Sequence, residues 1–83
     1  MRVAFTSHAE VQVQFRKLDK ALVEQVALHP EQVIEVKGGR RWAQSRYVRG
    51  GMQHLLRVLF EDQGEVRIIV TAYTTSRLAK YWR

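Results

Sequence analysis

Basic and aromatic side chains that could bind a nucleic acid gather in the middle of the chain. The aromatic residues Trp42 and Tyr47 are interleaved there with the cations Lys37, Arg40, Arg41, Arg46 and Arg49. Cations of this kind bind backbone phosphates, and flat rings stack on unpaired bases. We therefore predict that Arg40, Arg41, Arg46 and Arg49 bind RNA. The alternative is a solvated charged turn, with Trp42 facing the core.

The three histidines do not form a recognisable catalytic or metal motif. His8, His29 and His54 are far apart, and no H-x-x-x-H or carboxylate–histidine spacing indicates a metal site. His54 is the best acid–base candidate on chemistry alone, because imidazole titrates near neutral pH. His8 begins a predicted helix, where a histidine more often packs or caps. We predict no metal site and no cofactor.

The stretch from Leu55 to Tyr73 predicts the β-hairpin on which the other elements pack. Two apolar runs flank a turn at residues 61–64, where Gly64 can adopt a positive φ. Strand side chains alternate between two faces, so Arg57 and its apolar neighbours must lie on opposite sides. Arg57 and Arg67 should both reach water or a ligand. We expect Arg46 beside Arg57 on the open face, and a buried face of Leu56, Val58, Phe60, Val66, Ile68 and Val70.

Composition limits the setting and the partners. The chain has 83 residues, a formal net charge of +6 and no cysteine. Without cysteine there is neither a disulfide framework nor thiolate chemistry, so we expect a reducing, cytoplasmic location. No apolar run is long enough to span a bilayer, and we expect no membrane partner. The positive charge favours a polyanionic or acidic partner, the alternative being a merely basic surface.

The N-terminal half predicts a strand and two helices. A short strand at residues 1–5 precedes Ser7, which with Glu10 has the spacing of a capping box. The first helix would pack through Val11, Phe15 and Leu18. Asp19 would cap a second helix over residues 20–29, with Leu22, Val23, Val26 and Ala27 on one stripe, ended by Pro30. One continuous bent helix is the alternative.

The C-terminal half predicts strands joined by glycine turns. Residues 33–37 and 41–48 precede the hairpin, and Gly-Gly pairs at 38–39 and 50–51 mark the turns. Short turns make consecutive strands antiparallel. We therefore predict one α+β domain over residues 1–83, with two helices on a curved antiparallel sheet in the order β-α-α-β-β-β-β. The neighbour of the first strand stays open.

Two motifs and one strand resemble the RelE/ParE toxin superfamily, and its small bacterial members in particular. The motifs are Ser7-His8-Ala9 near the start and T-A-Y-x-T-S-R…Y-W at residues 71–82, and the strand is L-L-R-V-L-F-E at 55–61. The resemblance implies a toxin of a type II toxin–antitoxin system, neutralised by an antitoxin protein. Its RelE branch implies metal-independent cleavage of mRNA on the ribosome, and its ParE branch implies inhibition of DNA gyrase.

The resemblance also implies a catalytic set. Arg57 and Arg77 stand where such toxins keep phosphate-binding arginines, and Tyr81 where they keep a late tyrosine. In cleavage by the ribose 2′-hydroxyl, an arginine fork stabilises the charge on phosphorus. Lys80 and Arg77 would lower the pKa of Tyr81. Alternatively, Arg57 pairs with Glu61 or Glu35 across the sheet, and the protein is a non-catalytic binding module.

Residues 74–83 have no core of their own but end in two aromatic residues. We therefore expect this C-terminal segment to return over the open end of the sheet. It would bring Arg77, Lys80 and Tyr81 near Arg57, while Trp82 acts as an apolar plug. Lys80 would add one more cation for RNA.

Overall fold

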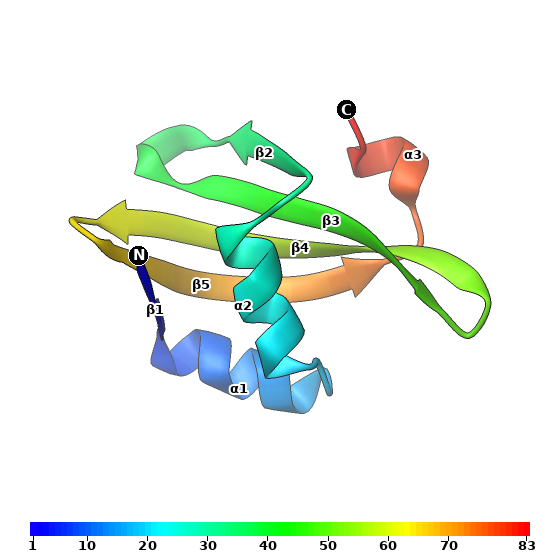
Figure 1. Cartoon of the computed structure of the whole chain (residues 1–83), viewed down its shortest axis with the longest axis horizontal. Coiled ribbons are helices and arrows are strands. Elements are labelled where there is room, and N and C mark those ends of the chain that lie inside the picture. The colour runs from blue at the N-terminus through cyan, green and yellow to red at the C-terminus, as the bar shows by residue number, and fades with distance from the viewer.

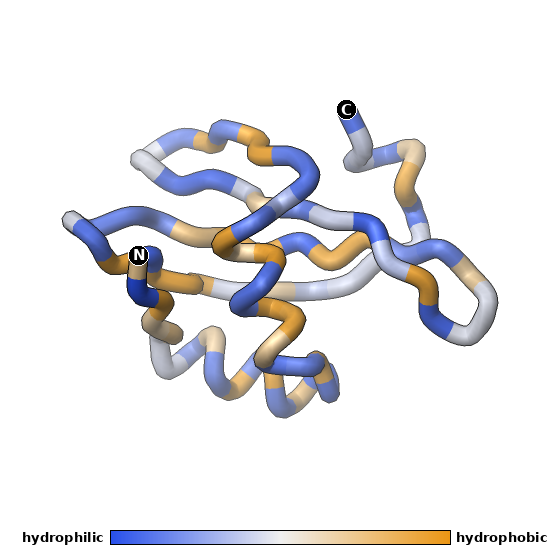
Figure 2. Tube along the Cα trace, viewed as in Figure 1, coloured by the Kyte–Doolittle hydropathy of each residue, from blue (hydrophilic) through white to orange (hydrophobic).

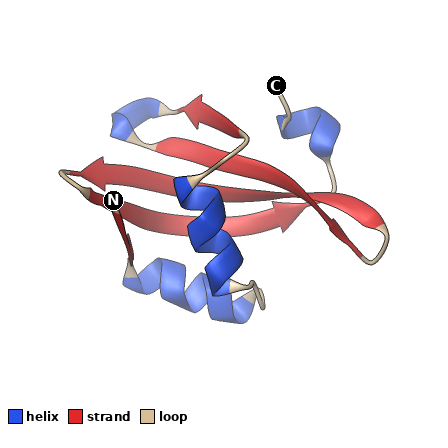
Figure 3. Cartoon of the chain, in the orientation of Figure 1, coloured by secondary structure: helices blue, strands red, loops and turns tan.

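A five-stranded sheet with two helices on one face forms the body of the protein (Figure 1). The computed structural model describes residues 1–83. The elements are β1 Arg2–Phe5, α1 Ser7–Phe15, α2 Lys20–Leu28, β2 Gln32–Glu35, β3 Arg41–Arg49, β4 Met52–Gln63, β5 Val66–Thr75 and α3 Leu78–Tyr81. A 3-10 turn, Lys37–Gly39, joins β2 to β3. Figure 3 shows that strand structure dominates after α2. None of the three helices is long and apolar enough to cross a membrane.

The sheet is mixed, with the strand order β1-β5-β4-β3-β2. The strands from β2 to β5 are antiparallel neighbours, as the short turns predict. β1 instead pairs with β5 in parallel, so the expectation of a wholly antiparallel sheet is wrong at this edge. The physical reason is that no turn connects β1 to β5. The chain between them includes two helices, which leaves β1 free to run in either direction.

Both N-terminal helices form, with one cap displaced from its predicted position. The N-cap of α1 is Thr6, whose hydroxyl accepts a hydrogen bond from the amide of Ala9 at 3.0 Å, so Ser7 is the first helical residue and not the cap. Asp19 caps α2 as predicted, accepting from the amides of Ala21 and Leu22. Lys17, at a φ of 54°, turns the chain between the helices and excludes one continuous bent helix.

The helix face that α1 buries differs from the predicted one. Ala9 and Val13 are buried, whereas Val11 is 60% exposed and Phe15 is 72% exposed. Residues four apart share one face of a helix. The small side chain of Ala9 lets its face approach β5 closely, whereas the larger side chains of Val11 and Phe15 would keep the helix and the strand apart. The buried residues of α2 are Val23, Val26 and Ala27, within its predicted stripe. Figure 2 shows apolar positions along both helices and along the strands beneath them.

The hairpin β4–β5 contains a β-bulge that changes which side chains of β5 face the helices. Leu59 lies opposite Thr71 and Phe60 opposite Ile69, so Val70 is the extra residue. An extra residue reverses the alternation on one side of the bulge. Leu56, Val58 and Phe60 are buried as predicted, and Ile69 and Ala72 complete the core from β5. The prediction that Val66, Ile68 and Val70 would be the buried residues of this arm is wrong.

The bulge also moves Arg67 to the helix side of the sheet. Its Nη1 donates to the carbonyl oxygen of Ala27 in α2 at 2.7 Å, and its Nε donates to Asp62 at 2.8 Å. Its guanidinium carbon lies 4.2 Å from the ring centroid of Phe60. The expectation that Arg67 lies on the open face, within reach of water or a ligand, is therefore wrong, because this arginine joins α2 to the hairpin.

Candidate functional site

Arg57 lies at the centre of the sheet face opposite α1 and α2, and it is only 7% exposed. Its neighbours across the sheet are Gln44 on β3 and Tyr73 on β5. The Nε atom donates to Gln44 Oε1 at 2.9 Å, and Nη1 donates to the Tyr73 hydroxyl at 2.7 Å. The alternative pairing with Glu61 or Glu35 is absent. Those carboxylates lie beside Arg40 and Arg41.

One nitrogen of the Arg57 guanidinium is left for a ligand. Nη2 makes no hydrogen bond within the protein, and every buried side-chain nitrogen or oxygen of the chain has a partner. Nη2 must therefore reach solvent, with two N–H donors available. The rest of the group is fixed by hydrogen bonds, so the free edge is held in one orientation.

Three aromatic rings surround the same guanidinium. Its central carbon lies 4.4 Å from the ring centroid of Trp42, 4.3 Å from that of Tyr81 and 5.7 Å from that of Tyr73. Tyr73 meets the other two rings edge to face. Faces of aromatic rings attract a cation, most strongly where water is excluded. These contacts hold Arg57 in place without an acidic partner, which would compete with a phosphate.

The two tyrosines of the cluster have opposite pKa shifts. Burial is the main cause that raises the pKa of Tyr73 above 10.0, and the neighbouring Tyr81 hydroxyl acts in the same direction. The hydrogen bond with Tyr73 is the main cause that lowers the pKa of Tyr81, and the charges of Lys80 and Arg57 lower it further. Tyr73 therefore holds its proton more tightly, while Tyr81 is the hydroxyl that ionises first.

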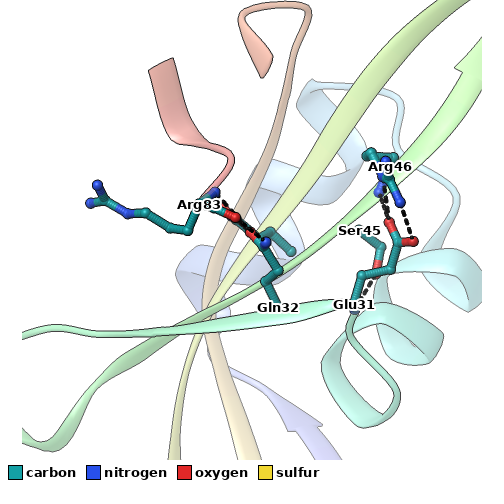
Figure 4. A network of polar contacts seen from close by, with 6 residues as sticks. Glu31, Gln32, Ser45, Arg46 and Arg83 are labelled. Carbon is teal, nitrogen blue, oxygen red and sulfur yellow. Dashed lines mark hydrogen bonds and ion pairs between the residues drawn. The ribbon is translucent and has the colours of Figure 1, made fainter. Parts of the chain in front are cut away.

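The C-terminal segment brings Tyr81 near Arg57 as predicted, whereas the side chain of Lys80 meets Tyr81 and makes no contact with Arg57. The Tyr81 carbonyl accepts from Gln44 Nε2 at 3.0 Å, and the ring of Trp82 lies 4.3 Å from the guanidinium carbon of Arg46. Gln32 binds both the backbone N–H and the carbonyl of Arg83 (Figure 4). Lys80 Nζ lies 5.3 Å from the Tyr81 ring centroid.

Arg77 is the predicted catalytic residue that no contact joins to the cluster. Its side chain makes no hydrogen bond, ion pair or cation–π contact. Its backbone N–H donates to Thr75 Oγ1 at 3.1 Å, and its carbonyl oxygen accepts from the N–H of Lys80 at 3.2 Å. The residue is exposed at the start of α3. The expected convergence of Arg77 with Arg57 is therefore not observed.

The predicted RNA-binding arginines lie along β3 and its turns, and they differ in whether an acidic side chain pairs with them. Arg46 shares the open face with Arg57, as predicted, and forms a two-pronged ion pair with Glu31 (Figure 4). This pair lowers the pKa of Glu31. Arg40 lies 3.7 Å from Glu61, and Arg41 lies 3.3 Å from Glu35. Arg49 makes no ion pair, but it lines a pocket with Lys17, Asp19 and Leu22 on the helix side of the sheet, away from Arg57.

The histidines lie outside the cluster. His54 projects to the helix side, where its ring centroid is 5.7 Å from that of Tyr47 and its Nδ1 is 3.1 Å from the Met52 carbonyl oxygen. His8 and His29 are exposed and make no side-chain hydrogen bond. No group of three histidine or acidic side chains has the geometry to hold a metal ion.

Sequence reasoning missed Gln44 as a member of the site. It is fully buried, and its three hydrogen bonds join Arg57 to Gln32 and Tyr81. The signal was present, since an amide between Ala43 and Ser45 in the centre of a strand needs partners once it is buried. Tyr73 and Trp42 were noted as aromatic residues but not as neighbours of Arg57.

Fold and site define a small α+β protein with a caged arginine and two interacting tyrosines on its open sheet face. The chain belongs to the family described as Domain of unknown function (DUF4258), which it matches over residues 5–74. Arg57, Gln44 and Tyr73 lie inside the matched region, and Tyr81 lies beyond it. No curated protein and no solved structure matches the chain.

Proposed function

We propose that this protein is the toxin of a type II toxin–antitoxin system, an endoribonuclease that cuts mRNA without a metal ion. One observation carries the proposal. The guanidinium of Arg57 presents one free edge beside Tyr81, whose pKa is lowered. An anchored phosphate ligand next to an ionisable hydroxyl is the minimum that cleavage by the ribose 2′-hydroxyl requires. The resemblance of residues 71–82 to RelE-type toxins supports the same reading.

The reaction assigns one role to each group. The phenolate of Tyr81 takes the proton from the 2′-hydroxyl, and the freed oxygen bonds to the adjacent phosphorus. Arg57 Nη2 donates to a phosphate oxygen and stabilises the extra charge. The bond from phosphorus to the 5′-oxygen then breaks, and Lys80 gives that oxygen a proton. The products are a 2′,3′-cyclic phosphate and a 5′-hydroxyl.

The basic strand supplies the RNA-binding surface in this proposal. Arg40, Arg41, Arg46 and Arg49 follow one strand and its turns, and Arg46 and Tyr81 lie on the same face. Long-range attraction from a net charge of +6 would bring RNA or the ribosome to that face. The same charge suits an antitoxin with acidic residues. Arg77, exposed near α3, would join the phosphate ligands only after RNA binds.

A cleavage assay with purified protein tests the proposal. The substrates are a labelled single-stranded RNA and an mRNA bound to ribosomes, both in excess EDTA. We expect products with a 2′,3′-cyclic phosphate, and no cleavage where the 2′-hydroxyl is replaced by hydrogen. Arg57→Ala should abolish cleavage, and Lys20→Gln on the opposite face is the matched control. If the folded wild-type chain cuts neither substrate, the proposal is wrong.

The burial of Arg57 favours a second candidate, a non-catalytic binding module such as a gyrase inhibitor or an orphan interaction protein. A side chain that is 7% exposed and bonded through two of its nitrogens has the contacts of a structural group. Expression in bacteria separates the two candidates. Growth arrest that persists in both Arg57→Ala and Arg77→Ala would favour the binding module, whereas arrest lost with Arg57→Ala in a folded variant would favour the nuclease.

A further inference from the structure

We propose that Gln44 is the positioning residue of this site, because one side-chain amide fixes both Arg57 and the segment that carries Tyr81. The inference rests on the proposed function and adds to it the group that sets its geometry. Gln44 is 0% exposed and lies on β3, directly opposite Arg57 on β4. It therefore cannot touch RNA itself.

The orientation of the Gln44 amide follows from its partners. Its oxygen faces Arg57 Nε at 2.9 Å, and a guanidinium can only donate. Its nitrogen faces the carbonyl oxygen of Tyr81 at 3.0 Å, and a carbonyl can only accept. The second N–H of the amide donates to Gln32 Oε1 at 2.8 Å. Each polar atom of Gln44 thus has a partner of the right kind, and the reversed amide would lose all three bonds.

Gln32 extends this arrangement to the end of the segment. Its Oε1 accepts from both Gln44 and the N–H of Arg83, and its Nε2 donates to the Arg83 carbonyl at 2.7 Å. The two glutamines hold the backbone at Tyr81 and Arg83, on either side of Trp82. α3 has only four residues and no buried one, so these bonds are its main polar attachment to the sheet.

The side-chain amide of Gln44 therefore sets the distance between Arg57, which would bind the phosphate, and Tyr81, which would act as the general base. If the segment moved, Tyr81 would lose both its place over Arg57 and the hydroxyl of Tyr73. Its pKa would then rise toward 10.0, because the hydrogen bond with Tyr73 is the largest cause of the lowering. Arg57 would remain on the sheet. We therefore predict a site in which Arg57 still binds phosphate while Tyr81, the general base, is displaced.

Two variants separate positioning from bulk stability. Gln44→Glu keeps an acceptor for Arg57 Nε but places an anion against the Tyr81 carbonyl and Gln32 Oε1. Gln32→Met removes the attachment of Arg83 without touching Arg57 or burying a charge. Gln25→Glu, exposed on α2, is the matched control. Gln32→Met covers the case in which Gln44→Glu fails to fold.

The experiment reads the position of Tyr81 with and without catalysis. Labelled tyrosine followed by NMR should show the Tyr81 titration at higher pH in Gln32→Met, which adds no charge beside the hydroxyl. Trypsin should cut after Arg77 and Lys80 on the order of tenfold faster, since Gln44→Glu removes one hydrogen bond of the segment and Gln32→Met removes two. Cleavage of RNA by Gln32→Met should fall in kcat with little change in KM, because Arg57 keeps its own partners and still binds phosphate.

Unchanged Tyr81 titration and unchanged tryptic rates in the folded variants would overturn the role of Gln44, whatever the cleavage assay gives. If the wild-type chain cuts no RNA but both readouts move, the proposed function fails and the positioning role stands. If cleavage by Gln32→Met falls only through KM, the two glutamines act on phosphate binding alone and the positioning proposal is wrong.

Discussion

The ring of Tyr81 lies over the guanidinium of Arg57, with 4.3 Å between the ring centroid and the guanidinium carbon. Twenty-three residues lie between them in the sequence. The contact joins α3 to the centre of the sheet on the face that α1 and α2 leave open. It places an ionisable hydroxyl beside Nη2 of Arg57, the proposed phosphate-binding atom, and the first two predictions test that pairing.

Replacing Tyr81 with phenylalanine should remove cleavage while keeping the fold. The ring still covers Arg57, so we expect the unfolding midpoint to change little, whereas loss of a general base lowers kcat by about 10²–10⁴-fold. Rates are measured under single-turnover conditions, and circular dichroism checks the fold. Phe15→Tyr, an exposed change on α1, is the control. Full activity in Tyr81→Phe would remove the tyrosine from the mechanism.

The pH profile of cleavage should follow the ionisation of Tyr81. A base acts when deprotonated, so the rate should rise with pH and level off at the Tyr81 pKa, which the Tyr73 hydrogen bond holds below 10.0. Tyr73→Phe removes that donor and should move the rise to higher pH. The measurement is kcat against pH for both proteins. Superimposable profiles would contradict the coupling of the two hydroxyls.

Stability should decrease in acid through Asp62. Its hydrogen bond with Arg67 is the main cause that holds its pKa below 3.8 in the folded protein. The unfolded chain therefore binds the proton first, and the stabilisation, complete above about pH 4, is lost as the pH falls further. Urea unfolding at pH 6 and pH 2.5 should show a smaller difference for Asp62→Asn than for wild type. An equal difference would mean that the Asp62–Arg67 pair adds no stability.

The buried face of α1 can be tested with two valines two positions apart. Val13→Ala should lower the free energy of unfolding by about 2 kcal/mol, because the side chain is 5% exposed and packs in the core. Val11→Ala, at a residue that is 60% exposed, should change it by less than about 0.5 kcal/mol. Urea denaturation measures both. The reverse ranking would restore the face predicted from the sequence.

RNA binding should weaken steeply as the salt concentration rises, and Lys37 and Arg49 should account for a defined part of this salt dependence. Lys37 and Arg49 make no ion pair within the protein, so each can neutralise a phosphate without breaking one. The slope of log affinity against log salt should fall by about 1.4 for single-stranded RNA in Lys37→Gln/Arg49→Gln. Lys20→Gln, on the helix side, is the control. Salt-independent binding would exclude a nucleic acid partner.

The sequence by itself determined much of the local structure. Asp19 and Pro30 bound the second helix because a cap and a missing N–H act within a turn of the chain. Leu56, Val58 and Phe60 point into the core because strand side chains alternate. Arg57 had to face the other way for the same reason. The docking of Tyr81 and Trp82 also followed from the cost of leaving two aromatic rings in water.

Tertiary structure decided what depends on contacts between distant segments. β1 could be placed beside β5 only by the three-dimensional fold, since no short connection sets its direction. The bulge at Val70, between residues paired with β4, reversed the expected faces of Ile68 and Arg67. The partners of Arg57 were likewise set by register. Gln44 and Tyr73 lie opposite it on two strands, and neither Glu35 nor Glu61 of the alternative interpretation is its partner.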